Sequence, residues 1–184
     1  MDHNYSVNTV KPARFAPRWQ PFELESQEQF DKLAASIASA ELAEHLERCF
    51  QLCRRQGFDL TVLCLALDAP ASQTDPAQRL AVTQTLESIS LARAARLYTL
   101  DSGDYLATFC GEPLYQARRI GEDYRQSIVD LNLKTGSRPM TISVGMCSGP
   151  ADSNVGAERL NQCAMAQLRI AQDRGGNRVE ARQK

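Results

Sequence analysis

Long apolar runs, an export signal, an excess of one charge and a group of histidines are all missing from this 184-residue sequence. No stretch approaches the roughly 18 apolar residues of a transmembrane helix, so membrane insertion is not expected. The first residues lack the apolar core of an export signal, and the net charge is only −1. A nearly neutral chain has no general attraction for nucleic acid or anionic membranes. We therefore expect a cytoplasmic globular protein that binds neither nucleic acid nor membranes.

The six cysteines do not indicate a disulfide framework. Disulfide scaffolds are typical of small exported domains, and this chain has neither property. Cys64, Cys110 and Cys147 stand within apolar runs, where a thiol behaves as a small apolar side chain. Cys49 and Cys53 are four residues apart, which suits one face of a helix rather than a C-x-x-C motif. The sequence therefore predicts buried, reduced thiols.

Two regions differ in pattern. Residues 1–25 are rich in proline and polar residues without a period, and we interpret them as an arm that is flexible or draped on the body. From Ser26 the spacing of apolar residues predicts a leading helix, with Ser26 and Gln29 as a capping box and Gly57 as its end. The apolar residues at three- and four-residue steps are Phe30, Leu33, Ile37, Leu42, Leu46, Phe50 and Cys53. We expect residues 26–184 to form one domain.

Alternating strands and helices follow the leading helix, and this order predicts an α/β sandwich. The run from Phe58 to Asp68 is almost wholly apolar, as in a strand that is buried on both faces. The predicted strands are 58–68, 96–100, 105–110, 141–147 and 177–181, and the predicted helices are 76–95, 113–131 and 156–173.

Two carboxylates form the first candidate site. Asp68 ends the first predicted strand, and Asp104 lies in the tight turn of the predicted hairpin 96–110. If the hairpin lies beside the first strand, both carboxylates are able to face one site, and paired carboxylates with substrate phosphates are a usual environment for Mg²⁺. The alternative is local turn chemistry, because aspartate is common at strand ends and beside glycine in turns.

Several separated runs resemble, in order and spacing, a GGDEF domain of the diguanylate cyclase family, which joins two GTP molecules into cyclic di-GMP. They are LTVLCLALD, RLYTLDSGDYLATFC, TISVGMC and LNQCAMAQLRIAQDRGGNRVE. The resemblance covers about residues 40–181. It implies a nucleotidyl-cyclase-like three-layer sandwich with a central, mostly antiparallel five-stranded sheet flanked by helices.

The signature turn departs from the family pattern G-G-D/E-E-F, because here it consists of Ser102, Gly103, Asp104, Tyr105 and Leu106. The resemblance assigns metal ligation to Asp68 and Asp104. The acid expected at the fourth position of the turn is Tyr105, and the second acid expected after the first strand is Pro70.

The positions that resemble the family's nucleotide contacts have also changed. The guanine-binding asparagine is replaced by Pro76, the second guanine contact falls near Thr85, the phosphate-binding lysine is Gln172, and an arginine position is Gly176. Losing these contacts would cost roughly 5–8 kcal/mol of GTP binding at about 1.5–3 kcal/mol per charged hydrogen bond. The resemblance therefore implies a degenerate, non-catalytic domain that requires no cofactor and takes Mg²⁺ only with a bound nucleotide.

The family's product-binding R-x-x-D motif reads Arg93-Ala94-Ala95-Arg96 here, so its aspartate is replaced by a cation. Our leading hypothesis is a signalling or scaffold module that acts through protein–protein contacts in a cyclic di-GMP-linked pathway. Its partner is another protein or a second copy of the chain, and the leading helix and Trp19 in the arm are candidate contacts. One alternative is a receptor that binds cyclic di-GMP, GTP or another nucleotide through Arg93 and Arg96, with Asp68 and Asp104 as further candidate contacts. Another is a residual cyclase.

Overall fold

The computed structural model describes residues 27–69, 73–151 and 156–183, and for residues 27–38 it describes the backbone alone. The predicted arm and the Ser26 cap lie outside these residues. The leading helix α1 spans Gln27–Gln56 without a break. It ends where predicted, because Gly57 takes a positive φ of 67° and lets the Phe58 amide donate back to the Cys53 carbonyl at 2.9 Å.

The central sheet has five strands in the order β2-β3-β1-β6-β7. Neighbouring strands are antiparallel except for β6 and β7, which are parallel. This confirms the predicted α/β sandwich and its mostly antiparallel sheet. The strands are β1 (Asp59–Leu67), β2 (Leu97–Thr99), β3 (Tyr105–Cys110), β6 (Ile142–Pro150) and β7 (Val179–Gln183).

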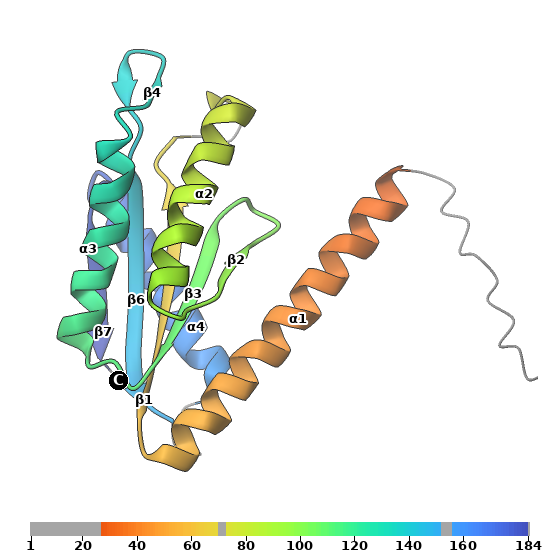
Figure 1. Ribbon diagram of the computed structural model, residues 1–184, viewed down its shortest axis with the longest axis vertical. Helices are drawn as coiled ribbons and strands as arrows, with labels where there is room; N and C mark the ends of the chain where they lie inside the picture. Colours follow the sequence, from red (N-terminus) through yellow and green to blue (C-terminus); the bar gives the residue numbers. More distant parts are fainter. Residues whose placement is uncertain (1–26, 70–72, 152–155, 184) are drawn as a thin grey trace, which may run out of the picture.

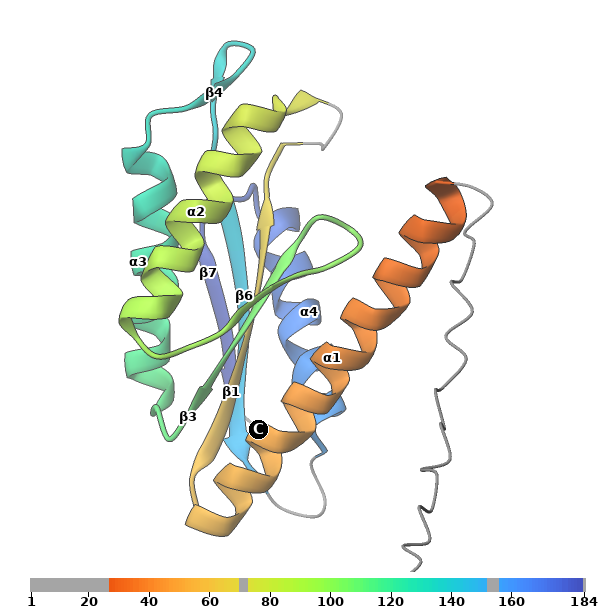
Figure 2. The same cartoon turned by 45° about the vertical axis from the view of Figure 1, so that its right-hand side comes forward.

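Helices cover both faces of the sheet (Figures 1 and 2). Helices α2 (Pro76–Ala92) and α3 (Leu114–Asp130) pack on one face, which we call the α2–α3 face. Helix α4 (Ala157–Asp173) and the C-terminal half of α1 pack on the other, the α1–α4 face. The rest of α1 leans away from the sheet (Figure 1). No described helix combines the length and apolar composition needed to cross a membrane.

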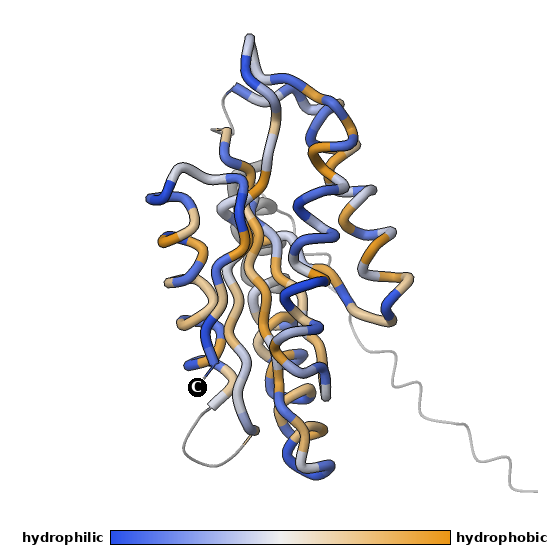
Figure 3. The backbone as a smooth tube through the Cα atoms, turned by 90° about the vertical axis from the view of Figure 1, so that its left-hand side faces the viewer, coloured by the Kyte–Doolittle hydropathy of each residue, from blue (hydrophilic) through white to orange (hydrophobic). Residues whose placement is uncertain are grey.

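Each face of the sheet has its own apolar core, and the alternation of side chains along the strands separates the two. Along β1, Leu63 and Leu65 belong to the α2–α3 core, whereas Val62 and Cys64 belong to the α1–α4 core. Figure 3 shows the apolar colouring concentrated along these inner strands. This burial on both faces explains why β1 is almost wholly apolar.

Several elements differ from their predicted bounds: β6 runs on to Pro150 rather than residue 147, and β7 spans Val179–Gln183 rather than 177–181. Helix α2 ends at Ala92 rather than residue 95, because Ala94 takes a φ of 53° and the Ala95 amide donates back to the Ser90 carbonyl at 2.9 Å. A small ribbon of β4 (Lys134–Thr135) and β5 (Arg138–Pro139) was not predicted. Two-residue strands are too short to show a period in the sequence.

Candidate functional site

The signature turn joins β2 to β3 through backbone hydrogen bonds. The Leu100 amide donates to the Asp104 carbonyl and the Gly103 amide donates to the Leu100 carbonyl, both at 2.8 Å. Gly103 has a φ of 80°, a conformation that glycine adopts without strain. The Ser102 hydroxyl donates to the Asp104 carboxylate at 2.8 Å. Part of the hydrogen-bonding capacity of Asp104 is therefore used within the turn itself.

Tyr105, at the fourth position of the turn, points into the protein rather than toward a ligand. Its side chain is 2% exposed and belongs to the α2–α3 core. Its hydroxyl lies 2.8 Å from the hydroxyl of Thr83 on α2. Leu106 is also buried, on the opposite face. A residue that ties α2 to the sheet therefore occupies the position where the resemblance leads one to expect an acid.

Asp68 accepts hydrogen bonds from three donors. Its Oδ1 atom accepts from the Ser143 hydroxyl at 2.5 Å, and its Oδ2 atom accepts from the Thr141 hydroxyl at 2.6 Å and from the Asn177 amide at 2.8 Å. A carboxylate offers about four lone-pair positions, so about one remains. Asp68 joins the end of β1 to β6 and to the turn before β7.

Gly176 allows this arrangement. It has a φ of 74°, and a Cβ atom placed on it would lie 2.7 Å from Cγ of Asp68. Any side chain at position 176 would therefore push the carboxylate away from the turn. The glycine that replaces the expected arginine lets Asp68 approach the Asn177 amide closely. Gly176, which departs from the family pattern, and Asp68, which keeps it, act together to hold the turn.

The hairpin does lie beside the first strand, as the paired-carboxylate hypothesis requires. Leu65 of β1 pairs with Tyr105 of β3, so Asp68 and Asp104 come from the same end of the sheet. Their hydrogen bonds are nevertheless separate, and among the described residues no group of three or more His, Cys, Asp or Glu side chains is placed to hold a metal. A Mg²⁺ ion would compete for Asp68 with the donors already bound. These residues fit a magnesium–nucleotide group poorly.

The positions matched to guanine contacts serve α2 instead. Pro76 is the first residue of the helix, and the Asp75 carboxylate caps it by accepting from the Ala77 amide at 3.1 Å. The Thr85 hydroxyl donates to the Ala81 carbonyl of the same helix at 2.8 Å. Pro70 lies outside the described residues. Neither described position presents a base-binding group to the turn.

Arg93 and Arg96 do not converge on one site. Arg93 pairs with Asp123 of α3, and both side chains are partly exposed. Arg96 approaches Glu41 of α1 at 3.6 Å, and its guanidinium lies 4.8 Å from the centre of the Tyr98 ring. Each arginine therefore joins a helix to its surroundings, and a phosphate would share the guanidinium with an acidic partner.

Sequence reasoning missed Arg79 and His45. The Arg79 guanidinium lies against the signature turn, with Nη2 at 3.5 Å from the Gly103 carbonyl oxygen. His45 Nε2 lies 2.9 Å from the Thr108 hydroxyl and joins α1 to β3. Both contacts span more than twenty residues of sequence, and no local pattern marks either residue.

A scan against protein-family models finds no match for this sequence, and a search among curated proteins finds none either. Solved structures do match. The GGEEF domain of an active diguanylate cyclase from Vibrio cholerae superimposes with a TM-score of 0.69 at 13% identity, covering 79% of this chain and 97% of that one. The chain adopts the GGDEF fold.

Two further matching structures contain more than a GGDEF domain: one includes a coiled coil and the other a bound activator protein. The coiled coil and GGDEF domain of DgcB from Caulobacter crescentus, in complex with c-di-GMP, match with a TM-score of 0.68 at 16% identity, over 84% of this chain and 92% of that one. The match with the GGDEF domain of DgcB alone covers 76% of this chain and 87% of the DgcB chain. The diguanylate cyclase SiaD from Pseudomonas aeruginosa, in complex with its activator SiaC, matches with a TM-score of 0.67 at 16% identity. This match covers 84% of this chain and 68% of the SiaD chain. The GGDEF fold therefore extends over most of the described residues.

Proposed function

We propose that this chain is a non-catalytic signalling module of the GGDEF fold that acts through protein contacts in a cyclic di-GMP-linked pathway. One observation carries the proposal: Tyr105 stands in place of the fourth acid of the signature turn and is buried against Thr83. A buried phenol bonded to a hydroxyl supplies neither a metal ligand nor a carboxylate beside the turn. Through Tyr105, the turn instead contacts and stabilises α2.

The contacts of Asp68 and of the two arginines support the same proposal. Asp68 uses three of its acceptor positions for internal donors, and Arg93 and Arg96 are each next to an acidic side chain. A metal-bound GTP at Asp68 would have to break several hydrogen bonds of that carboxylate, and a nucleotide at either arginine would compete with its acidic partner. Each hydrogen bond to a charged group is worth about 1.5–3 kcal/mol, so the combined penalty disfavours substrate binding.

Helix α1 is the proposed contact element. The structure of DgcB that includes its coiled coil covers 84% of this chain, against 76% for the DgcB domain alone, which favours α1 as the counterpart of a coiled-coil helix. A coiled coil needs a partner helix, so a second copy of the chain is one expected partner. SiaD is bound to a protein activator, which supports a different protein as the other.

A thermal-shift titration with cyclic di-GMP and with GTP, each with and without Mg²⁺, tests the non-catalytic part. A ligand that binds the folded state raises its melting temperature. We expect no shift with GTP and Mg²⁺, whereas the active Vibrio cholerae domain serves as the positive control. A Mg²⁺-dependent GTP shift would restore the cyclase hypothesis. A shift with cyclic di-GMP alone would instead favour a receptor.

A product assay completes this test. The purified chain is incubated at high concentration with GTP and Mg²⁺, beside its Asp104→Ala variant. We expect no cyclic di-GMP from either protein. Product from the parent chain that disappears in the variant would overturn the proposal and place Asp104 in a working site.

Light scattering tests the contact role of α1. Ile37 is one of the apolar residues that recur at three- and four-residue steps in the sequence, and Ser36 is its polar neighbour. If two copies pair through α1, Ile37→Asp lowers the molar mass toward that of a monomer, whereas the matched control Ser36→Asp does not. A monomeric parent chain at all concentrations would restrict the proposal to a different protein as partner.

A further inference from the structure

Three cysteines meet where α1 crosses β3. Cys49 and Cys53 lie one helical turn apart on α1, and Cys110 is the last residue of β3. The Cys110 thiol interacts with the thiols of both helix residues, and its Sγ atom lies 3.9 Å from the Cys49 carbonyl oxygen. All three belong to the α1–α4 core. Cys110 is therefore placed to react with a thiol on α1.

Exposure distinguishes the two possible partners of Cys110. Cys49 and Cys110 are half-buried, whereas Cys53 is fully buried. Oxidation by a small molecule requires access to a sulfur atom, so Cys49 and Cys110 are the accessible pair. Polar groups also surround the Cys49 sulfur, since His45 Nε2 lies at 3.4 Å and the Thr108 hydroxyl at 3.6 Å.

We propose that Cys49 and Cys110 form an oxidation site that closes into a disulfide and fixes α1 to the sheet. The oxidant is a hydroperoxide. It first converts one thiol to a sulfenic acid, breaking the O–O bond and releasing water or an alcohol. The second sulfur then attacks the sulfenic sulfur, and the S–S bond forms with loss of water. Overall, two thiols and one hydroperoxide give one disulfide, one alcohol or water, and one further water.

The reaction is a slow one. Contact with Cys110 and burial raise the pKa of the Cys49 thiol, so Cys49 remains protonated at neutral pH. Because the thiolate is the reactive form, brief exposure to low peroxide leaves the pair reduced. Sustained oxidation closes the bond. Its effect is mechanical, because it joins residues 49 and 110 and holds the packed C-terminal half of α1 on the sheet (Figure 2).

The experiment treats the full chain with excess hydrogen peroxide, blocks remaining thiols, and maps peptides by mass spectrometry without reduction. We expect a linked pair of peptides carrying Cys49 and Cys110, two fewer free thiols out of six, and reversal by dithiothreitol. The oxidised chain should also melt at a temperature at least about 5 °C higher, because the bond restricts the unfolded chain.

Serine variants provide the matched controls. Cys49→Ser and Cys110→Ser should abolish the link, whereas Cys53→Ser and Cys163→Ser should retain it, and alanine replaces serine if a variant fails to fold. A link between Cys53 and Cys110 in the parent chain would overturn the assignment. So would sulfenic or sulfinic products at Cys49 or Cys110 without any link. The peptide map of the parent chain decides the matter even if every variant unfolds.

Discussion

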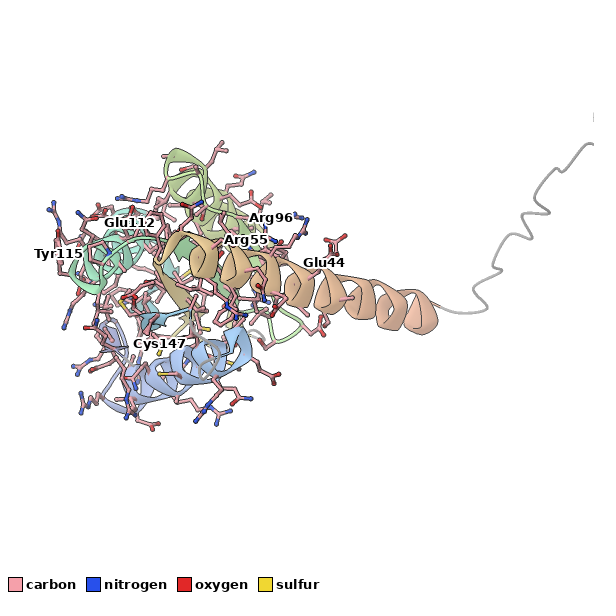
Figure 4. All side chains as sticks on the ribbon, turned by 90° about the horizontal axis from the view of Figure 1, so that it is seen from below. Glu44, Arg55, Arg96, Glu112, Tyr115 and Cys147 are labelled. Atoms are coloured by element: carbon pink, nitrogen blue, oxygen red, sulfur yellow. The ribbon has the colours of Figure 1, made fainter. Side chains whose placement is uncertain are left out.

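The two faces of the sheet are built from different chemistry. All six cysteines lie on the α1–α4 face, as the buried Cys147 between the sheet and α4 illustrates in Figure 4. The α2–α3 face instead carries buried tyrosines bonded to hydroxyls: Tyr105 to Thr83 at 2.8 Å and Tyr124 to Ser90 at 2.7 Å. Tyr98, on the α1–α4 face, has a buried hydroxyl without a partner among the described residues.

The two kinds of packing hold the helices differently. Directional bonds between phenols and hydroxyls tie α2 to the sheet and α3 to α2, which keeps the signature hairpin in place. Small, polarisable thiols tolerate small shifts of the helix above them. The face that carries α1 is therefore adaptable, which suits the contact role proposed for α1. Substitutions that compare the two faces test this interpretation.

The largest expected effect is that of Gly145→Ala on the α1–α4 face. A Cβ atom there would lie 2.0 Å from the Leu168 amide nitrogen and 2.3 Å from the Ala164 carbonyl oxygen, both backbone atoms of α4. Helix α4 would have to move away from β6, at an expected cost of about 3 kcal/mol or more. Urea unfolding measures this cost.

Gly121→Ala on α3 is the matched control from the other face. Its Cβ atom would meet only side-chain atoms, of Met146 and Val179, at 3.1 Å. Met146 is able to move, and alanine favours the helix by about 1 kcal/mol over glycine, so we expect little net change. Similar losses of unfolding free energy for Gly145→Ala and Gly121→Ala would show that the close backbone contact between α4 and β6 does not determine the cost.

Asp68→Ala comes next in size. The substitution removes the acceptor for Ser143, Thr141 and the Asn177 amide, and because the site is exposed we expect a loss of about 1–2 kcal/mol. Gly176→Ala should cost a similar amount through its clash with the same carboxylate. In the double variant the clash is absent, so the two losses should be less than additive. Simple additivity in urea unfolding would contradict the proposed contact.

The sequence was sufficient for the order of the four helices and of the five strands of the central sheet, because each of these elements carries a local signal. The apolar run of β1, the spacing in α1 and the Gly57 stop all predict what the structure contains. The hairpin lies beside β1, the condition under which Asp68 and Asp104 come from one end of the sheet. Where the Asp68 carboxylate points was not predictable, because its donors come from about 75 and 109 residues away along the chain. The same holds for Tyr105, whose burial depends on α2.

Two tyrosine-to-phenylalanine substitutions sharpen the comparison between faces. Tyr124→Phe removes the bond to Ser90, and we expect a loss of about 1 kcal/mol. Tyr98→Phe removes a buried hydroxyl that has no partner in the described part of the chain, so it should be neutral or stabilising. Thermal unfolding of both variants measures the contrast. A loss at Tyr98 as large as that at Tyr124 would mean that its hydroxyl has a partner after all.

The smallest expected effect is a pH dependence from His45, which joins α1 to β3. Burial, followed by the charges of Arg96 and Arg48, lowers the pKa of His45 from its ordinary value of 6.5. Its ring also faces Tyr98 and the Cys49 thiol. Below pH 6.5 the unfolded chain therefore binds a proton that the folded chain does not yet bind.

The sign of the effect follows from this difference. The stabilising contribution is fully present above pH 6.5 and is lost as the pH falls from there through the lowered, folded-state pKa. Because His45 is partly exposed, the loss should stay below about 1 kcal/mol. Urea midpoints measured between about pH 7.5 and pH 5.5 should fall less in His45→Gln than in the parent chain. Equal decreases of the urea midpoint in the two proteins would mean that other groups cause the acid sensitivity. His45 would then not control how firmly α1 is attached to β3.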